Sequence, residues 1–454
     1  MKHTDIIQTL NLEQKCALLS GETVFTTRAL PGKGIPAITL SDGPNGVRKQ
    51  AGAADHLGLN PSVPATCFPT SSATACSWDE KLGEAVGEAL GEEAAAQEVA
   101  VLLGPGLNIQ RSPLCGRDFE YFSEDPILAG RMAAAYVRGI QKNGISACPK
   151  HFAVNSQELR RMASDSVLDE RTLRELYLTG FEIVVKEAKP KTIMTSYNLI
   201  NGTYANENAH LLQDILRKDW GFDGAVVTDW GGSNDHALGV KNGSTLEMPC
   251  PGGDSIRELM KAVQDGKISE ADVDARLEEM LELVLSTHAA VEKAPRTFDA
   301  AAHHKLARRA AAESIVLLRN EGGILPLKPN EKLAVIGDFA ETPRYQGAGS
   351  SAVNALQVET LLDCIKADDS GITFVGYASG FERQGAAGAE KLEEAVALAK
   401  KADTVLLCLG LDELRESEGL DRADMKLAEN QQRLLAAVAA VNPNVVVLLS
   451  AGAP

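Results

Sequence analysis

The sequence predicts an α/β protein with two successive α/β blocks, and three observations support this class. Through residue 290, short apolar strand-like segments alternate with amphipathic helices, as in a (β/α) barrel or a doubly wound sheet. From residue 333 the alternation resumes with strands that are apolar throughout, as in a parallel sheet covered on both faces. Between the blocks, residues 292–299 show no hydrophobic periodicity, which is typical of a linker.

In the first block, polar residues and helical patterns separate the expected strands. One expected helix follows Ser77, which has Glu80 three residues later in the spacing of a capping box. Another helix is expected over residues 170–188, and Pro190 should end it. The expected strands are residues 37–41, 100–103, 145–148, 192–196, 225–228 and 244–248.

In the second block, a helix over residues 301–320 is expected to lead into a parallel sheet. The predicted domains are residues 1–295, a linker over 296–325, and residues 326–454. Because the sequence stops at Pro454 directly after a strand of the buried type, we expect the second domain to be truncated. The expected strands are 333–336, 373–377, 404–409 and 445–449, and the expected helices between them are 386–402 and 424–441.

The amino-acid composition indicates which partners the protein is expected to bind and in which cellular compartment it is expected to lie. The chain has 454 residues and a net charge of -17, from 62 acidic and 45 basic residues, which argues against nucleic acid or an anionic membrane as partner. No apolar run reaches about 18 residues, so no membrane span is expected. The polar N-terminal segment does not resemble a secretory signal. The eight scattered cysteines form no CxxC pair, which favours reduced thiols in the cytoplasm over disulfides or a zinc site.

Polar residues follow the ends of five expected barrel strands, where the catalytic groups of a (β/α) barrel gather. The most informative end is that of strand 225–228, which leads directly into Asp229 and Trp230. A single such residue is more often a solvated rim residue, but five ends together predict one shared polar pocket. The other polar residues are Asp42, Arg48, Arg117, Lys150, His151, Arg161 and Tyr197.

This pocket would combine two acids, several hydrogen-bond donors and two aromatic rings, which suits a polyhydroxylated ring such as a sugar. Glycoside cleavage needs two carboxyl groups, and Asp229 is a candidate for the first. The acidic segment 412–422 follows the end of strand 404–409 and could supply the second, although it also has the character of a charged surface loop. The chain has no Walker motif, and the Gly-rich segment 347–351 is either a turn or a ligand contact.

These residues resemble glycoside hydrolase family 3, and in particular its β-glucosidase branch. The resemblance covers essentially the whole chain, and the order and spacing of the motifs agree as well as their residues. The motifs are SDGPNGVR at 41–48, GPGLNIQR at 104–111, CGRDFEYFSEDP at 115–126, KHFAVN at 150–155, TSYN at 195–198, VTDWG at 227–231 and EGLDR at 418–422.

The resemblance implies a TIM-like (β/α)8-type barrel followed by an α/β sandwich domain, with the active site between them. It implies that Asp229 is the nucleophile and Glu418 the acid/base, with Glu416 as the alternative to Glu418. The two carboxyl groups should lie about 5–5.5 Å apart, and Glu418 should have a raised pKa while the cations keep Asp229 ionised. No cofactor and no metal are expected. The implied sugar-binding residues are Asp42, Arg48, Arg117, Lys150, His151, Arg161, Tyr197, Trp230 and Ser350.

The activity implied is that of a retaining exo-acting β-glucosidase, which hydrolyses terminal nonreducing β-D-glucosyl residues of β-glucosides and short oligosaccharides. The partner is then a small-molecule sugar, with self-association left open. Within the family, a β-xylosidase and an N-acetyl-β-glucosaminidase are alternatives, but Asp42 with Trp230 favours glucose, and the Lys-His-Phe-Ala-Val sequence at 150–154 disfavours the aminidase. Outside this class, the alternatives are a lyase or aldolase that uses Lys150 as a Schiff base and an inactive sugar-binding fragment.

Overall fold

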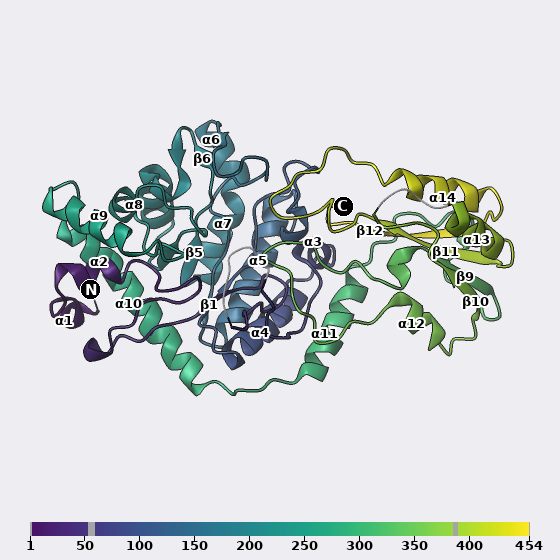
Figure 1. The fold of residues 1–454 in the computed structure, drawn as a ribbon, viewed down its shortest axis with the longest axis horizontal. Helices are drawn as coiled ribbons and strands as arrows, with labels where there is room; N and C mark the ends of the chain where they lie inside the picture. The colour runs from purple at the N-terminus through teal and green to yellow at the C-terminus, as the bar shows by residue number, and fades with distance from the viewer. Residues whose placement is uncertain (1, 53–59, 385–388, 454) are drawn as a thin grey trace.

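The computed structural model describes residues 2–52, 60–384 and 389–453. The chain forms two lobes (Figure 1): an N-terminal lobe in purple to teal, and a C-terminal lobe in green to yellow. The long helix α10 (Glu270–Lys293) ends the first lobe, and a loop leads from it to α11 (Ala300–Glu313). No helix in the described ranges combines the length and the apolar character needed to cross a membrane.

The first lobe is a TIM-like barrel of short parallel strands, so this prediction is confirmed and the doubly wound alternative is wrong. The strands β1, β2 and β3 pair in that order, and β5 pairs with β8. Parallel bridges join Phe152 to Thr195 and Val227 to Leu246, which continues the succession around the barrel. The strands are β1 (Leu40–Asp42), β2 (Val101–Leu103), β3 (Ser146–Ala147), β5 (Thr192–Met194) and β8 (Ala225–Val227), and a small separate sheet holds β4 (Asp165–Ser166), β6 (Leu199–Ile200) and β7 (Thr203–Tyr204).

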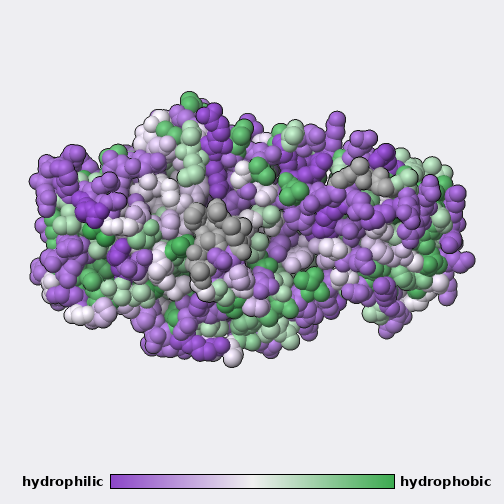
Figure 2. Space-filling view, in the orientation of Figure 1, coloured by the Kyte–Doolittle hydropathy of each residue, from purple (hydrophilic) through white to green (hydrophobic). Residues whose placement is uncertain are grey.

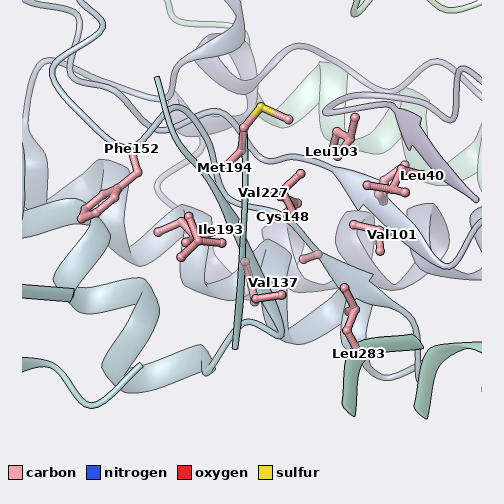
Figure 3. Close-up of a cluster of buried hydrophobic side chains, with 14 of the residues drawn as sticks. Leu40, Val101, Leu103, Val137, Cys148, Phe152, Ile193, Met194, Val227 and Leu283 are labelled. Carbon is pink, nitrogen blue, oxygen red and sulfur yellow. The ribbon is translucent and has the colours of Figure 1, made fainter. Parts of the chain in front are cut away.

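Apolar side chains from the barrel strands meet the surrounding helices in one continuous core. Figure 3 shows Leu40, Ile193 and Val227 from three strands, with Val137 from α5 and Leu283 from α10 below them. Burial of such side chains is the main stabilising contribution to the lobe. The α-helices are α1 (Thr4–Ile7), α2 (Leu12–Ala17), α3 (Ser71–Ala75), α4 (Glu80–Ala96), α5 (Pro126–Gln141), α6 (Glu170–Thr172), α7 (Thr179–Ile183), α8 (His236–Asn242) and α9 (Gly253–Gln264). The 3-10 and π segments are η1 (Pro31–Lys33), η2 (Asp118–Glu120), η3 (Leu173–Tyr177), η4 (Val184–Ala188), η5 (Ala205–Glu207) and η6 (His210–Asp219).

Local expectations in the first lobe have mixed outcomes. The helix over 170–188 is present as α6, η3, α7 and η4, and it ends at Ala188, before Pro190. The capping box at Ser77 is wrong, because Asp79 caps α4 by accepting hydrogen bonds from the amides of Lys81 and Leu82. An ionised carboxylate at a helix N-terminus is a strong cap, and the Ser77 hydroxyl instead donates to a carbonyl of the preceding turn. The segment 244–248 contributes bridges rather than a regular strand.

The second lobe is a fully parallel four-stranded sheet with strand order β10-β9-β11-β12. In Figure 1, α14 lies above this sheet and α12 below it, which is the α/β sandwich predicted from the sequence. From β9 the chain adds β10 on one side of the sheet, and it then adds β11 and β12 on the other side. The loops after β9 and β11 therefore leave the sheet side by side at a topological switch point, where α/β sheets bind ligands. The elements are β9 (Lys332–Ile336), β10 (Thr373–Ala378), β11 (Thr404–Gly410), β12 (Val445–Ser450), α12 (Leu361–Lys366), α13 (Ala389–Ala399), α14 (Glu429–Ala439), η7 (Glu321–Gly323) and η8 (Asp338–Ala340).

The expected strands of this lobe match β9 to β12 closely, but its helices are shorter than expected. The helix predicted over 301–320 ends at Glu313, where the Ser314 hydroxyl donates to the Ala310 carbonyl and β-branched Ile315 and Val316 follow. The helix predicted over 424–441 is α14, and residues 386–388 of the other lie outside the described residues. On β12, Val447 and Leu449 are 44% and 51% exposed.

The two lobes are joined by backbone pairing as well as by the linker. The amide of Ala65 donates to the carbonyl of Asn354, the amide of Leu356 donates back to Ala65, and Val353 packs into the barrel core. Figure 2 shows a mainly hydrophilic face with small apolar patches, as the net charge of -17 leads one to expect. The loop after β9 is therefore held against the barrel.

Candidate active site

Asp229 lies just beyond the C-terminal end of β8, at the floor of the barrel's polar end. Its side chain is buried, with the residue only 8% exposed. Oδ1 accepts a hydrogen bond from the Trp230 amide at 2.7 Å, whereas Oδ2 accepts none from any described residue and lies 3.6 Å from His151 Nε2. Burial raises the pKa of Asp229 above its usual value, and the nearby cations offset only part of this effect. The carboxylate thus presents one unengaged oxygen.

Lys150 lies between two carboxylates beside this floor. Its Nζ is 3.8 Å from Asp42 Oδ1, at the end of β1, and 3.8 Å from Glu120 Oε1. Burial raises the pKa of Asp42 to about 6, although Lys150 and Arg48 act in the opposite direction. Because Lys150 is an ion-pair partner rather than an isolated amine, the structure gives no support to a Schiff-base role.

His151 is held in one orientation by a contact to its ring and by two hydrogen bonds to its backbone. Its Nδ1 is 3.1 Å from Tyr121 Oη, and its backbone exchanges two hydrogen bonds with the Asn108 side chain. Burial lowers the pKa of His151 well below its usual value, and Arg117 and Lys150 add to this effect. The ring is therefore neutral at physiological pH and can act as a hydrogen-bond partner but not as a cation.

Trp230 and Tyr197 form an aromatic wall next to Asp229. The Tyr197 hydroxyl donates to the Trp230 carbonyl at 2.9 Å, and the Arg161 guanidinium lies over the Tyr197 ring at 4.9 Å. The Trp230 indole donates from Nε1 to the Val24 carbonyl, which fixes the plane of the ring. Such a wall can contact the apolar face of a sugar ring.

Glu418 reaches the site from the second lobe, on the loop after β11. This loop runs beside the loop after β9: the Glu418 amide donates to the Ala348 carbonyl, and Glu418 Oε2 accepts from the Ser350 amide at 2.7 Å. Gly349 has a φ of +123°, and a Cβ at this position would lie 2.4 Å from Glu418 Cβ. Only glycine therefore fits here. Ser350 also accepts from Arg48 Nη1 through its carbonyl, at 3.4 Å.

The cations of the barrel surround the Glu418 carboxylate. Oε1 lies 3.0 Å from Arg161 Nη1 and 3.5 Å from Arg117 Nη1. Burial acts to raise the pKa of Glu418, but Arg117, Arg161 and the hydrogen bonds from Ser350 outweigh it and hold the pKa well below its usual range. The expectation of a raised pKa is wrong for this arrangement, because the two guanidinium groups stabilise the ionised form.

Glu416 points away from this cluster. Its carboxylate pairs with Arg344 at 2.9 Å and accepts from the Gly452 amide. Both side chains of this ion pair are buried, which is typical of a structural contact. Of the two glutamates considered from the sequence, the geometry brings Glu418 and not Glu416 to the site.

The structure brings all the sequence-predicted site residues into one connected set, and it adds four that were not assigned a role. Glu120 binds Arg117 through Nε at 2.5 Å, and Glu158 binds Arg161 at 2.7 Å. Each acid lies three residues from its arginine, a spacing that could have suggested the pair. The other two are Tyr121 and Asn108, which orient His151. Among the described residues, no group of three or more His, Cys, Asp and Glu side chains is arranged to hold a metal ion.

Comparison with known families agrees with this architecture. The model of the glycosyl hydrolase family 3 N terminal domain matches residues 53–283, and that of the family's C-terminal domain matches residues 315–454. A thermostable beta-glucosidase B from Acetivibrio thermocellus is 46% identical over 99% of this chain, and an exo-alpha-(1->6)-L-arabinopyranosidase from Bifidobacterium longum is 45% identical over 98%. The chain spans 60% of the length of each of these relatives.

A solved structure shows the same fold. Beta-glucosidase 3B from Thermotoga neapolitana, in complex with α-D-glucose, superposes with a TM-score of 0.89 at 33% identity. The match covers 100% of this chain and 69% of that one. The barrel, the sandwich and their relative placement are therefore shared with that enzyme.

Proposed function

This chain belongs to glycosyl hydrolase family 3, and from that premise we propose that it is a retaining, exo-acting β-glucosidase. It removes the terminal nonreducing β-D-glucosyl residue of β-glucosides and short oligosaccharides. The observation that carries the proposal is that two lobes each bring a carboxylate to one set of barrel cations: Asp229, whose Oδ2 is unengaged, and Glu418, which pairs with Arg161. The names of the relative from Acetivibrio thermocellus and of the glucose-bound structure support the choice of sugar.

In the first step, Asp229 Oδ2 attacks the anomeric carbon as the bond to the leaving oxygen breaks. Glu418 gives its proton to that oxygen, and a covalent glycosyl-enzyme forms. In the second step, Glu418 takes a proton from water, the water oxygen bonds to the anomeric carbon, and Asp229 departs. Two inversions give net retention of configuration.

For Glu418 to carry a proton, its contact with the arginines must weaken when substrate binds. Sugar hydroxyls accept hydrogen bonds, so a bound glucosyl ring competes with Glu418 for Arg117 and Arg161. A carboxylate that loses two cationic partners has a higher pKa. Binding of the sugar thus prepares the acid for the first step.

The other polar residues hold the sugar rather than react with it. Asp42 and Lys150 offer an acceptor and a donor at the barrel floor, and neutral His151 can do either. Trp230 and Tyr197 provide the aromatic wall. The binding energy of these contacts places the anomeric carbon in line with Asp229.

A second candidate is hydrolysis of α-L-arabinopyranosides. It is favoured by one observation, the 45% identity to the Bifidobacterium longum relative of that name. The same two carboxylates would serve both reactions, so only the sugar specificity separates the candidates.

A panel of nitrophenyl glycosides tests the proposed function. We expect the highest kcat/KM on the β-D-glucoside, with lower values on the β-D-xyloside, the N-acetyl-β-D-glucosaminide and the α-L-arabinopyranoside. A higher kcat/KM on one of these three glycosides would mean that its sugar, and not glucose, is the preferred one. If none of the four glycosides is hydrolysed, the proposal that the protein is a glycosidase is contradicted. Trapping of a carbonyl substrate at Lys150 by borohydride would favour the lyase class instead.

We also propose a cytoplasmic location, supported by the eight free thiols of the chain. Self-association stays an open proposal that sedimentation of the purified protein decides. Neither affects the chemistry assigned to Asp229 and Glu418.

A further inference from the structure

We propose that Asp421 is a positioning residue for Glu418: it fixes the loop of the second lobe onto the barrel by accepting hydrogen bonds from barrel backbone amides. This inference rests on the proposed function, because it concerns the acid/base group of that reaction. Within the part of the chain that the structure describes, Asp421 makes no hydrogen bond or ion pair with Asp229 or the sugar-binding residues, so it acts through the placement of its loop.

The Asp421 carboxylate bridges two separate barrel loops. Oδ1 accepts from the amides of Gly116 at 3.1 Å and Glu158 at 3.0 Å, and Oδ2 accepts from the amides of Glu158 at 3.1 Å and Leu159 at 2.8 Å. An ionised carboxylate is an acceptor with two oxygens, and it forms stronger hydrogen bonds to amides than a neutral group does. One side chain of the second lobe thus engages three barrel amides.

The barrel makes a reciprocal contact with the same loop. Glu158 Oε2 accepts from the Gly419 amide at 2.7 Å, directly after Glu418, and also from Arg161 Nη1 at 2.7 Å. The amide of Arg422 donates to the Leu114 carbonyl at 2.7 Å. Contacts of this loop with the barrel therefore lie one, three and four residues after Glu418, through the Gly419 amide, the Asp421 side chain and the Arg422 amide.

The fit between the loop and the barrel leaves no space for a side chain at Gly116. A Cβ on Gly116 would lie 1.7 Å from the Leu420 carbonyl oxygen and 2.4 Å from that of Ser417. Such distances are far below van der Waals contact, so a larger residue must displace the loop. The barrel backbone is thus a template for the segment that carries Glu418.

This docking matters because Glu418 and Asp229 come from different lobes. On its own lobe, Glu418 is held by Ala348 and Ser350. Those contacts fix Glu418 relative to the second lobe but not relative to Asp229. The barrel arginines hold the Glu418 carboxylate, and Asp421 holds the backbone of the loop that carries it. A displacement of about 1 Å in a reacting group can lower a rate by about 100-fold.

Kinetics with two leaving groups tests the proposal in the full chain. For Asp421→Ala, we expect kcat/KM on phenyl β-D-glucoside to fall by about 10- to 100-fold, whereas kcat/KM on 2,4-dinitrophenyl β-D-glucoside changes little, because that leaving group needs no proton. Azide should raise kcat on the dinitrophenyl substrate, as it replaces water that needs a base. Asp421→Asn, which keeps one acceptor oxygen, should lie between Ala and wild type.

Asp424→Ala is the matched control, since Asp424 is an exposed carboxylate of the same loop and accepts a hydrogen bond from the nearby Lys426 amide rather than from the barrel. It should match wild type on both substrates. Gly116→Ala disturbs the same contact by a change in the barrel, because the added methyl group collides with the loop. It should reproduce the leaving-group dependence of Asp421→Ala. Amide hydrogen exchange should rise in residues 414–422 and 113–118 of both docking variants.

An equal loss on both substrates, or wild-type kinetics in Asp421→Ala, would overturn the positioning role while leaving the glycosidase intact. If wild type hydrolyses neither substrate, the proposed function fails instead, and the exchange data then report separately whether Asp421 fixes the loop. Unchanged exchange in both docking variants would contradict the contact itself.

Discussion

Arg161 of the barrel and Glu418 of the second lobe form an ion pair, with Nη1 and Oε1 3.0 Å apart, although the residues are 257 positions apart in the chain. The same Nη1 is 2.7 Å from Glu158 Oε2, so one guanidinium joins the proposed acid/base to a buried barrel carboxylate. The ionised form of Glu418 is therefore stabilised by residues of the other lobe, Arg117 and Arg161.

Replacing Arg161 should shift the pH dependence of catalysis. Glu418 acts as an acid only when protonated, so kcat/KM falls as pH rises through its pKa. Arg161 lowers that pKa, and Arg161→Gln should therefore move the alkaline limb of the kcat/KM profile on phenyl β-D-glucoside to higher pH, even as the maximum falls through weaker sugar binding.

Arg171→Gln is the control for that measurement, because Arg171 is exposed and pairs with Glu175 on the surface. Its profile should match wild type. An alkaline limb that stays in place, or moves to lower pH, in Arg161→Gln would contradict the electrostatic assignment.

Glu418 and Glu416 should respond differently to removal. Glu418→Ala should lower kcat/KM on phenyl β-D-glucoside by about 10²- to 10⁴-fold, with azide restoring turnover of the dinitrophenyl substrate. Glu416→Ala leaves Arg344 buried without its partner and should lower the free energy of unfolding by about 3–5 kcal/mol. Denaturant unfolding and the two kinetic assays separate the effects, and azide rescue of Glu416→Ala would reverse the assignment.

Asp118 should make stability depend on pH at the contact between the lobes. Burial raises the pKa of Asp118 to about 8; Glu416 and Asp421 add to this, whereas Arg422 and Cys115 act in the opposite direction. The unfolded chain releases this proton near pH 4, but the folded protein keeps it until about pH 8, so the group's contribution to stability falls over that range as pH rises. This change in the free energy of unfolding is at most about 1.4 kcal/mol for each unit by which folding raises the pKa of Asp118.

Asp118→Asn resembles the protonated side chain and should remove this dependence. We expect its melting temperature to exceed that of wild type at pH 8 and to equal it near pH 4. A variant that is less stable than wild type at pH 8 would show that the ionised carboxylate is needed.

The strands of the second lobe could be predicted to within one or two residues, because each is a continuous apolar run in a parallel sheet: 333–336 against β9, for example. The barrel strands were harder, since β1 and β3 are short and segment 244–248 pairs only through bridges. Asp229 could be singled out because it directly follows an apolar strand. The ends of parallel strands lie on one rim of the barrel, and this argument gathered the sugar-binding residues of the first lobe. Ser350, on the second lobe, came only from the family resemblance.

The charge state of Glu418 could not be predicted in the same way. The positions of the barrel strand ends do not show which cations a loop from another lobe will contact. In the structure, Arg117 and Arg161 contact Glu418 between the two lobes. The contacts of Asp421, and the contact of Glu158 with the Gly419 amide, were missed for the same reason, because these partners are backbone amides that carry no mark in the sequence. What depends on the docking of two lobes requires the structure.

The central claim is that Asp229 is the nucleophile of a retaining glycosidase, and covalent trapping tests it most directly. A 2-deoxy-2-fluoro-β-D-glucoside with a good leaving group should inactivate the protein and add one sugar, which peptide mass spectrometry should place on Asp229. Asp229→Asn should take up no label. A label on Glu418, on Lys150 or on any other residue, or a first product of inverted configuration, would contradict the account.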